Sequence, residues 1–170
     1  TPLIKLKYPS EITGCNIYGK AEFMNPAGSI KDRTALGIIL DAEEKNLIEP
    51  GGTVVEGTFG NTGIALTMIN NARGYKTIIV MPDGASEEKQ SILRNMGAEL
   101  KVVATKPYSD PGNYQHVSKR LVEELQSKGE TSVMWANQFD NTANYKFHSK
   151  TTAKEIFNQL DGKVDGFTCA

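Results

Sequence analysis

The segment 77–81, Thr-Ile-Ile-Val-Met, is an almost unbroken apolar run. A run of this kind is typical of a strand buried on both faces of a parallel sheet, since successive side chains then point into two different cores. Shorter runs at 53–55, 99–103 and 131–135 are separated by segments with helical spacing of apolar residues. This alternation predicts right-handed βαβ units, and therefore an α/β fold built on a parallel sheet flanked by helices.

The helices that alternate with these strands have recognisable ends. One follows strand 53–55 and is expected to stop at Gly74, and another starts after Ser86, which can cap it. Two further helices are predicted from apolar faces made by Val117, Leu121, Val122 and Leu125 and by Ala153, Ile156, Phe157 and Leu160.

Both ends of the chain are expected to contribute strands. Residues 3–6 and 16–22 alternate between apolar and polar side chains around a turn at Thr13-Gly14. The final run, 164–170, has the pattern of a buried strand. No internal repeat interrupts this organisation.

Composition excludes several classes of function. The net charge is −1 with both signs interspersed, which gives no reason to expect nucleic acid or a membrane surface as a partner. No apolar run approaches the ~20 residues of a membrane span. Cys15 and Cys169 are isolated, so we expect buried, reduced thiols in an intracellular protein and no metal site. His116 and His148 have no nucleophile nearby in sequence, and solvated or packing roles are expected.

The segment around Lys31 is the first candidate for chemistry. Pro26 favours an extended arrival of the chain, Gly28 permits a turn, and Ser29 with Asp32 resembles a capping box that starts a helix. The expected helix carries an apolar stripe of Leu36, Ile39 and Leu40, with Ala35, Ile38 and Ala42 beside it. A cation in a first turn opposes the helix dipole, so Lys31 is either a solvated lysine that bends outward or an amine with a chemical use.

A second candidate is the glycine-rich stretch 56–63, Glu-Gly-Thr-Phe-Gly-Asn-Thr-Gly. It lies between strand 53–55 and the helical pattern that begins at Ile64. A turn of this kind leaves backbone N–H groups pointing at the helix N-terminus, where an anion can bind. Asn61 and Thr62 add side-chain donors, although both residue types also suit a helix start that binds no ligand.

Together these stretches resemble the cysteine synthase and cystathionine β-synthase family of pyridoxal-phosphate enzymes, which have the tryptophan-synthase β fold (fold type II). The segment Asn25–Arg33 matches the family's N-P-x-G-S-x-K-D-R pattern at every specified position. Thr58–Thr62 matches its T-S-G-N-T loop except at Phe59, and Gln138–Asn141 matches its Q-F-x-N segment. The similarity extends along essentially the whole chain, in the same order and spacing.

The resemblance implies a role for each matched residue. Lys31 is expected to form the Schiff base with pyridoxal 5'-phosphate and then to act as the general base at the substrate α-carbon. Asn61 is expected to contact the cofactor. The expected substrate contacts are Thr58, Phe59, Gly60, Asn61, Thr62 and Gln138. For Gln138 a plain polar turn residue remains the main alternative.

The resemblance also implies an arrangement of domains. Residues 1–24 would begin a large domain, 25–136 would form a small mobile domain, and 137–170 would return to the large domain. The chain stops before the family's phosphate-binding G-T-G-G-T loop, so we expect a piece of a protein of roughly twice the length. A homodimer is implied, and serine acetyltransferase is a conceivable partner that the sequence itself does not support. The expected compartment is the cytoplasm, or an organelle if a leader has been removed.

The activity implied is β-replacement, in which O-acetylserine and sulfide give cysteine and acetate by way of an aminoacrylate. The alternatives are cystathionine β-synthase chemistry with serine and homocysteine, β-elimination to a keto acid, and a non-enzymatic regulatory or binding protein that kept the fold. Phe59 favours the last of these, because its ring replaces a serine donor and could narrow the pocket. Gly57 stands where many relatives have proline, which leaves the substrate open.

Overall fold

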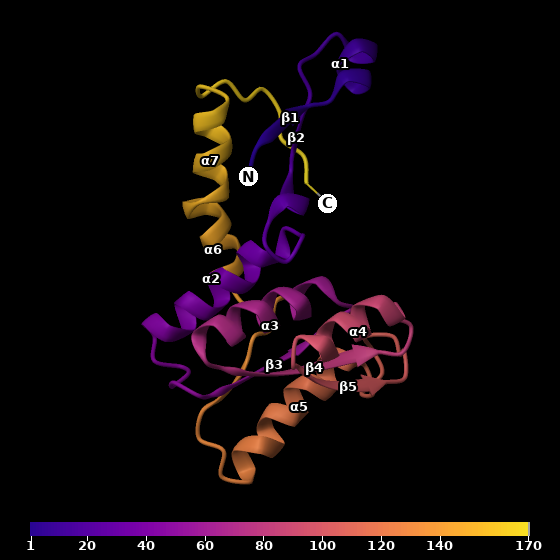
Figure 1. The fold of residues 1–170 in the computed structure, drawn as a ribbon, viewed down its shortest axis with the longest axis vertical. Coiled ribbons are helices and arrows are strands. Elements are labelled where there is room, and N and C mark those ends of the chain that lie inside the picture. Colours follow the sequence, from indigo (N-terminus) through magenta and orange to yellow (C-terminus); the bar gives the residue numbers. More distant parts are fainter. Residues whose placement is uncertain (170) are drawn as a thin grey trace.

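The computed structural model describes residues 1–169 and contains a four-stranded parallel sheet with the order β5-β4-β3-β6 (Figure 1). The strands are β3 (Thr53–Gly57), β4 (Lys76–Pro82), β5 (Glu99–Val103) and β6 (Val133–Trp135). All three neighbouring pairs are parallel, as the alternating pattern predicts. Strands β3 and β4 lie in the middle, and nearly all of their side chains are buried.

Helices cover both faces of this sheet. They are α2 (Lys31–Glu44), α3 (Asn61–Arg73), α4 (Glu87–Asn95) and α5 (Tyr114–Ser127). Val54 packs in one core with α2 and α3, whereas its neighbour Val55 packs in another with α5. Figure 1 accordingly shows α3 and α4 on one side of the sheet and α5 on the other. The predicted helix ends are confirmed where Gly74 takes up a left-handed conformation and the Ser86 side chain accepts from the backbone N–H of Lys89.

The rest of the described chain rises away from the sheet (Figure 1). It consists of α6 (Ala143–Lys150), α7 (Thr152–Gln159) and an antiparallel pair of β1 (Leu3–Lys5) with β2 (Tyr18–Lys20), followed by a 3-10 helix (Glu22–Met24). Helix α6 packs closely on α2, because a Cβ added to Gly37 would lie 2.5 Å from the Cβ of Phe147. Glu155 of α7 is bonded to Arg33 at 2.9 Å and to Lys20, and the Arg33 bond is the largest contribution that holds the pKa of this carboxyl far below its usual range.

Several expectations about individual segments are wrong. A helix, α1 (Lys7–Thr13), occupies most of the link where only a turn is predicted, and α6 has no counterpart among the predicted helices. Residues 164–169 form no strand, are exposed and make no backbone hydrogen bond to another strand of the described chain; Ala170 lies outside the described residues.

Three predictions of burial are also wrong. Cys15 and Cys169 are exposed free thiols, because neither lies on an element that packs against a core. Phe139 lies just beyond the strand predicted at 131–135, where an aromatic side chain is expected in the core, but it is exposed. In α2 the burial falls on Ala35, Ile38, Ile39 and Ala42, and Leu40 of the predicted stripe is 39% exposed, because it lies outside the face of α2 that joins this core.

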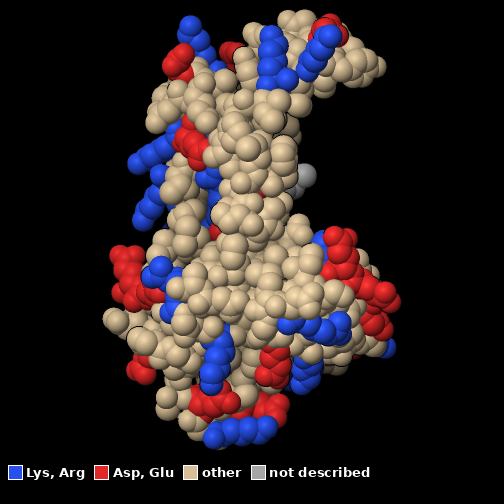
Figure 2. Space-filling view, viewed as in Figure 1, with Lys and Arg blue, Asp and Glu red and all other residues tan. Residues whose placement is uncertain are grey.

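Charged side chains surround the part of the molecule that contains the four-stranded sheet (Figure 2). In the upper part, which contains β1, β2 and α7, they lie mainly at the left side and the top of this view, and much of the surface turned to the viewer is uncharged. Within residues 1–169, no helix has both the length and the apolar character to cross a membrane.

Candidate active site

The loop between β3 and α3 is fixed by its own backbone. Gly60 has a φ of +148°, a conformation that side chains other than hydrogen rarely allow. Its N–H donates to the Thr58 hydroxyl at 3.1 Å, and the Thr58 N–H donates to the carbonyl of Val80 on β4 at 3.0 Å. Thr58 is only 4% exposed, so its hydroxyl serves the loop and is shielded from solvent.

The first turn of α3 presents free donors. Its N-cap is Gly60, which has no side chain to satisfy the helix terminus. The backbone N–H groups of Asn61, Thr62 and Gly63 have no acceptor within the described chain. Asn61 is exposed, and its carboxamide makes no hydrogen bond to residues 1–169. This helix end is therefore open to an anionic ligand.

The side chain of Gln138 lies under this loop and is buried. Its Nε2 donates to Oε1 of Glu56 at 3.0 Å and, more weakly, to the carbonyl of Gly57 at 3.4 Å. Its Oε1 accepts from the Thr62 hydroxyl. Gln138 thus joins the end of β3 to the start of α3 and lies beside the free donors of that helix.

Glu56 was not predicted as a site residue, yet it has the strongest electrostatic signature there. It is 1% exposed, and burial raises the pKa of its carboxyl to about 8, against the opposing effect of hydrogen bonds from Gln138 and Asn137. Its Oε2 has no hydrogen-bond partner among the residues that the structure describes. The available signal was a single carboxylate in an otherwise uncharged strand immediately before a glycine-rich loop.

Lys31 is the first residue of α2 and is half-buried. The predicted capping box is wrong in detail: the Ser29 hydroxyl accepts from the Lys31 N–H at 3.1 Å, whereas Asp32 Oδ2 accepts from the Ala27 N–H at 2.6 Å. The turn at Gly28, with φ +82°, brings Ala27 within reach of Asp32 and so replaces the expected bond. No acceptor within residues 1–169 binds the Lys31 amine, which leaves it available for chemistry.

Two hydrogen bonds connect the helix of Lys31 to Gln138, which itself bonds Thr62 at the start of α3. The Thr34 hydroxyl donates to Oδ1 of Asn144 at 2.9 Å, and Nδ2 of Asn144 donates to the carbonyl of Gln138 at 3.3 Å. The predicted residues of the loop and Gln138 are brought together directly, and the segment of Lys31 is joined to them through Asn144. Thr34 and Asn144 gave no sequence signal, because polar residues of their kind are common on helices.

His116 lies outside this arrangement, whereas Nε2 of His148 lies 3.4 Å from the Thr34 hydroxyl. His148 is in the last turn of α6, a helix that the sequence pattern does not predict. Its ring pairs with the Thr152 hydroxyl at 2.9 Å, and burial lowers its pKa. His116, in the first turn of α5, bonds the carbonyl of Tyr108 at 2.7 Å. Both rings have packing partners of their own.

Phe59 is turned toward α5. Its ring makes an edge-on contact with Tyr114, with 5.3 Å between ring centroids, and remains 48% exposed. Gly57 lies beneath the same helix end, where an added Cβ would be 2.8 Å from the carbonyl oxygen of Tyr114. The departures at Gly57 and Phe59 therefore occur together at one contact between the loop and α5.

Replacing Gly60 by alanine is expected to destabilise the protein by about 1–3 kcal/mol, because φ of +148° is strained for any side chain. The midpoint of denaturant unfolding measures this. An added Cβ would also overlap with Cδ of Lys89, so G60A combined with K89A is the control. We expect the double variant to remain destabilised, and full recovery would show that the clash, and not the backbone, sets the cost.

The known proteins that this chain resembles in sequence and in structure agree with one another. The family model described as "Pyridoxal-phosphate dependent enzyme" matches residues 1–170. Cysteine synthase 1 of Neurospora crassa is 52% identical over 100% of this chain and 44% of that enzyme, and cystathionine beta-synthase of Apis mellifera is 44% identical over 97% of this chain and 32% of that enzyme. A crystal structure of O-ureido-L-serine synthase superposes with a TM-score of 0.83 at 40% identity, covering 96% of this chain and 49% of that one.

The chain therefore spans less than half of the length of these curated relatives. Its residues fit the family's cofactor, pyridoxal 5'-phosphate. Within residues 1–169, Lys31 offers an amine without a partner, Asn61 offers an unbonded carboxamide, and the start of α3 offers backbone donors without a side-chain cap. The parallel sheet, the sequence identities and the superposition agree, and the chain belongs to the pyridoxal-phosphate-dependent enzymes of fold type II.

Proposed function

We propose that the full-length protein carrying this chain is a cysteine synthase-like enzyme, which converts O-acetylserine and sulfide into cysteine and acetate. The observation that carries the proposal is the helix of Lys31, with its free amine, joined by hydrogen bonds to a loop of free donors at the start of α3. The identity of 52% to Neurospora crassa cysteine synthase 1 supports the choice of reaction.

In this proposal Lys31 has two tasks. Its amine attaches the cofactor covalently, and once the amino-acid substrate has displaced it, the free amine removes the proton from the substrate α-carbon. The cofactor, when bound, supplies an electron sink for the carbanion that results. Asn61 orients the cofactor through its unbonded carboxamide.

The loop binds the substrate carboxylate. The N–H groups of Asn61, Thr62 and Gly63 have no acceptor within the described part of the chain, and the positive end of the α3 dipole lies beside them. Thr58 and Gly60 shape the loop through their mutual bond, and Gln138 approaches from β6. Phe59 contributes area to the same face.

The test is to incubate the full-length protein with pyridoxal phosphate, O-acetylserine and sulfide and to measure cysteine. Cysteine formation is the expected result, and its absence while the cofactor is demonstrably bound would contradict the proposal. Serine with homocysteine is the matched comparison, because it is the substrate pair of the cystathionine β-synthase alternative. A keto-acid assay on the same samples detects β-elimination.

A second candidate function is a binding or regulatory protein, and Phe59 is the observation that favours it. Exchanging Phe59 for serine removes the edge contact with Tyr114 and restores a donor. We expect F59S to change the KM for O-acetylserine by about threefold to tenfold, as the loss or gain of one or two contacts would. If F59S creates cysteine synthase activity that the native protein lacks, the binding-protein reading is supported instead.

We also infer the arrangement of the full-length protein. The sheet with α2 to α5 supports a small mobile domain over 25–136, with 1–24 and 137–170 belonging to a larger one. Free thiols at Cys15 and Cys169 suit a reducing compartment such as the cytoplasm. The homodimer follows from the family alone, and analytical ultracentrifugation of the full-length protein tests it.

A further inference from the structure

Three hydrogen bonds fix the orientation of the Gln138 carboxamide. Nε2 has two hydrogens, one directed at Glu56 Oε1 at 3.0 Å and the other at the Gly57 carbonyl at 3.4 Å, while Oε1 accepts from the Thr62 hydroxyl. A carboxamide turned by 180° would place an oxygen against two acceptor oxygens, and this arrangement would be unfavourable. One orientation is therefore selected.

The two bonds of Nε2 are of unequal strength. A distance of 3.0 Å lies in the usual range for an N–H donor, whereas 3.4 Å lies beyond it. The N–H directed at Gly57 can therefore exchange its acceptor, the Gly57 carbonyl, for a ligand oxygen at a small cost in free energy. The bond to Glu56 meanwhile holds the carboxamide in place.

Glu56 is built into the site as a fixed acceptor. It belongs to β3, whose neighbours β4 and β6 pair with it on both sides, and it is 1% exposed. No lysine, arginine or histidine contributes to its pKa, so burial keeps the carboxyl largely protonated at neutral pH. Oε1 accepts from Gln138, and Oε2 has no partner in residues 1–169.

We propose that Glu56 is a positioning residue, which holds the Gln138 carboxamide so that its second N–H can exchange the Gly57 carbonyl for the carboxylate of the amino-acid substrate. The proposal rests on the proposed function for the identity of that ligand. Glu56, the last charged residue before the loop, then acts entirely through Gln138.

The experiment measures equilibrium binding to the full-length, cofactor-loaded protein by calorimetry. The probe is L-alanine, which has a carboxylate but no leaving group, and L-alaninamide, which lacks the carboxylate, is the matched control ligand. For E56A we expect the Kd of alanine to rise about tenfold, as for one lost hydrogen bond that leaves a buried donor unpaired, and the Kd of alaninamide to change less than about twofold. Equal weakening of both ligands would contradict the proposal.

Three further variants separate positioning from folding. E56Q keeps an acceptor oxygen facing Gln138 and is expected to restore alanine binding to within about threefold of the native protein. In Q138A, adding E56A is expected to cause no further loss, because a residue that acts only through Gln138 has nothing left to position. T53V, at the buried opposite end of β3, is the control for disturbance of the strand and is expected to bind alanine normally.

Failure of this proposal can be told apart from failure of the proposed function. If the native protein makes no cysteine but binds alanine, and E56A still weakens that binding, the reaction is wrong and the role of Glu56 stands. If cysteine is formed and E56A binds alanine as tightly as the native protein does, the role of Glu56 is refuted. Additive losses in the E56A/Q138A double variant also refute it.

Discussion

Replacing Lys31 by alanine in the full-length protein is expected to lower cysteine formation by about 10³-fold or more, because the substitution removes both the covalent attachment of the cofactor and the base at the α-carbon. Stability should change little, since Lys31 is half-buried and its amine makes no hydrogen bond or ion pair within residues 1–169. A steady-state assay with O-acetylserine and sulfide measures the loss.

Borohydride reduction followed by peptide mapping identifies the attachment site independently of turnover. The native protein should carry the reduced cofactor on the peptide that contains Lys31, and K31A should carry none. Lys89, whose stem lies against Gly60 in the loop, provides the matched control, because K89A removes a nearby amine but leaves the attachment intact. A reduced adduct on Lys89 in the native protein would overturn the assignment of Lys31.

Replacing Glu56 by glutamine is expected to remove a large pH dependence of stability. The folded protein holds this carboxyl at a pKa of about 8, against an ordinary value of 4.5, because the group is buried. Between these values the folded state binds more protons than the unfolded state, so the stabilisation is complete below pH 4.5 and is lost as the pH rises through about 8. At about 1.4 kcal/mol per pH unit, a shift of this size corresponds to a loss on the order of 5 kcal/mol.

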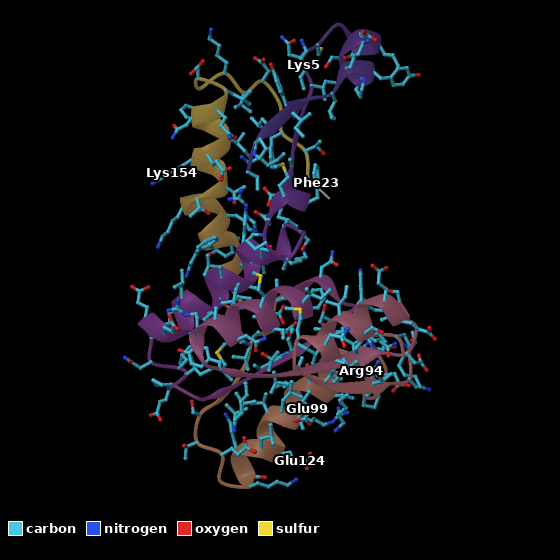
Figure 3. The ribbon with its side chains drawn as sticks, viewed as in Figure 1. Lys5, Phe23, Arg94, Glu99, Glu124 and Lys154 are labelled. Carbon is cyan, nitrogen blue, oxygen red and sulfur yellow. The ribbon has the colours of Figure 1, made fainter. Side chains whose placement is uncertain are left out.

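Glutamine has nearly the shape of a protonated glutamate and carries no titrating proton. The unfolding free energy of the native protein relative to that of E56Q should therefore decrease steadily from pH 5 to about pH 8 and level off above it, as measured by denaturant titration at each pH. E124Q is the control, because Glu124 is an exposed partner of Lys128 on the outer side of α5 (Figure 3). Parallel pH curves for the native protein and E56Q would show that the buried carboxyl does not titrate in this range.

The fold could be predicted from sequence where side-chain periodicity and burial coincide. Strand 77–81 is apolar on both faces and lies in the middle of the sheet, as β4. The final run 164–169 is also predicted as a strand but forms none: it contains Asp165 and Gly166, and it pairs with no strand of the described chain. Helix α6, which carries mixed polar and aromatic residues, is positioned by its close approach to Gly37, a tertiary contact that no local pattern encodes.

The candidate site was proposed from the sequence only in part. Lys31, the loop 58–62 and Gln138 were predicted because they match the family's segments, and their roles stay predictions. Glu56 and Asn144 were missed, since their importance comes from what they touch: Glu56 holds Nε2 of Gln138, and Asn144 connects its backbone to Thr34. Sequence identifies groups that act on a ligand more readily than groups that hold other groups in place.

The bridge through Asn144 has a consequence for protein engineering. The loop 58–62 and the helix of Lys31 are held in register by residues from two other segments, Gln138 and Asn144. A loop transplanted alone into a related scaffold would lack these hydrogen bonds. The position of its backbone donors relative to the lysine would then no longer be fixed. The smallest transferable unit of this candidate site is therefore spread over more than 100 positions of the chain, and a redesign of the site must exchange all of its pieces together.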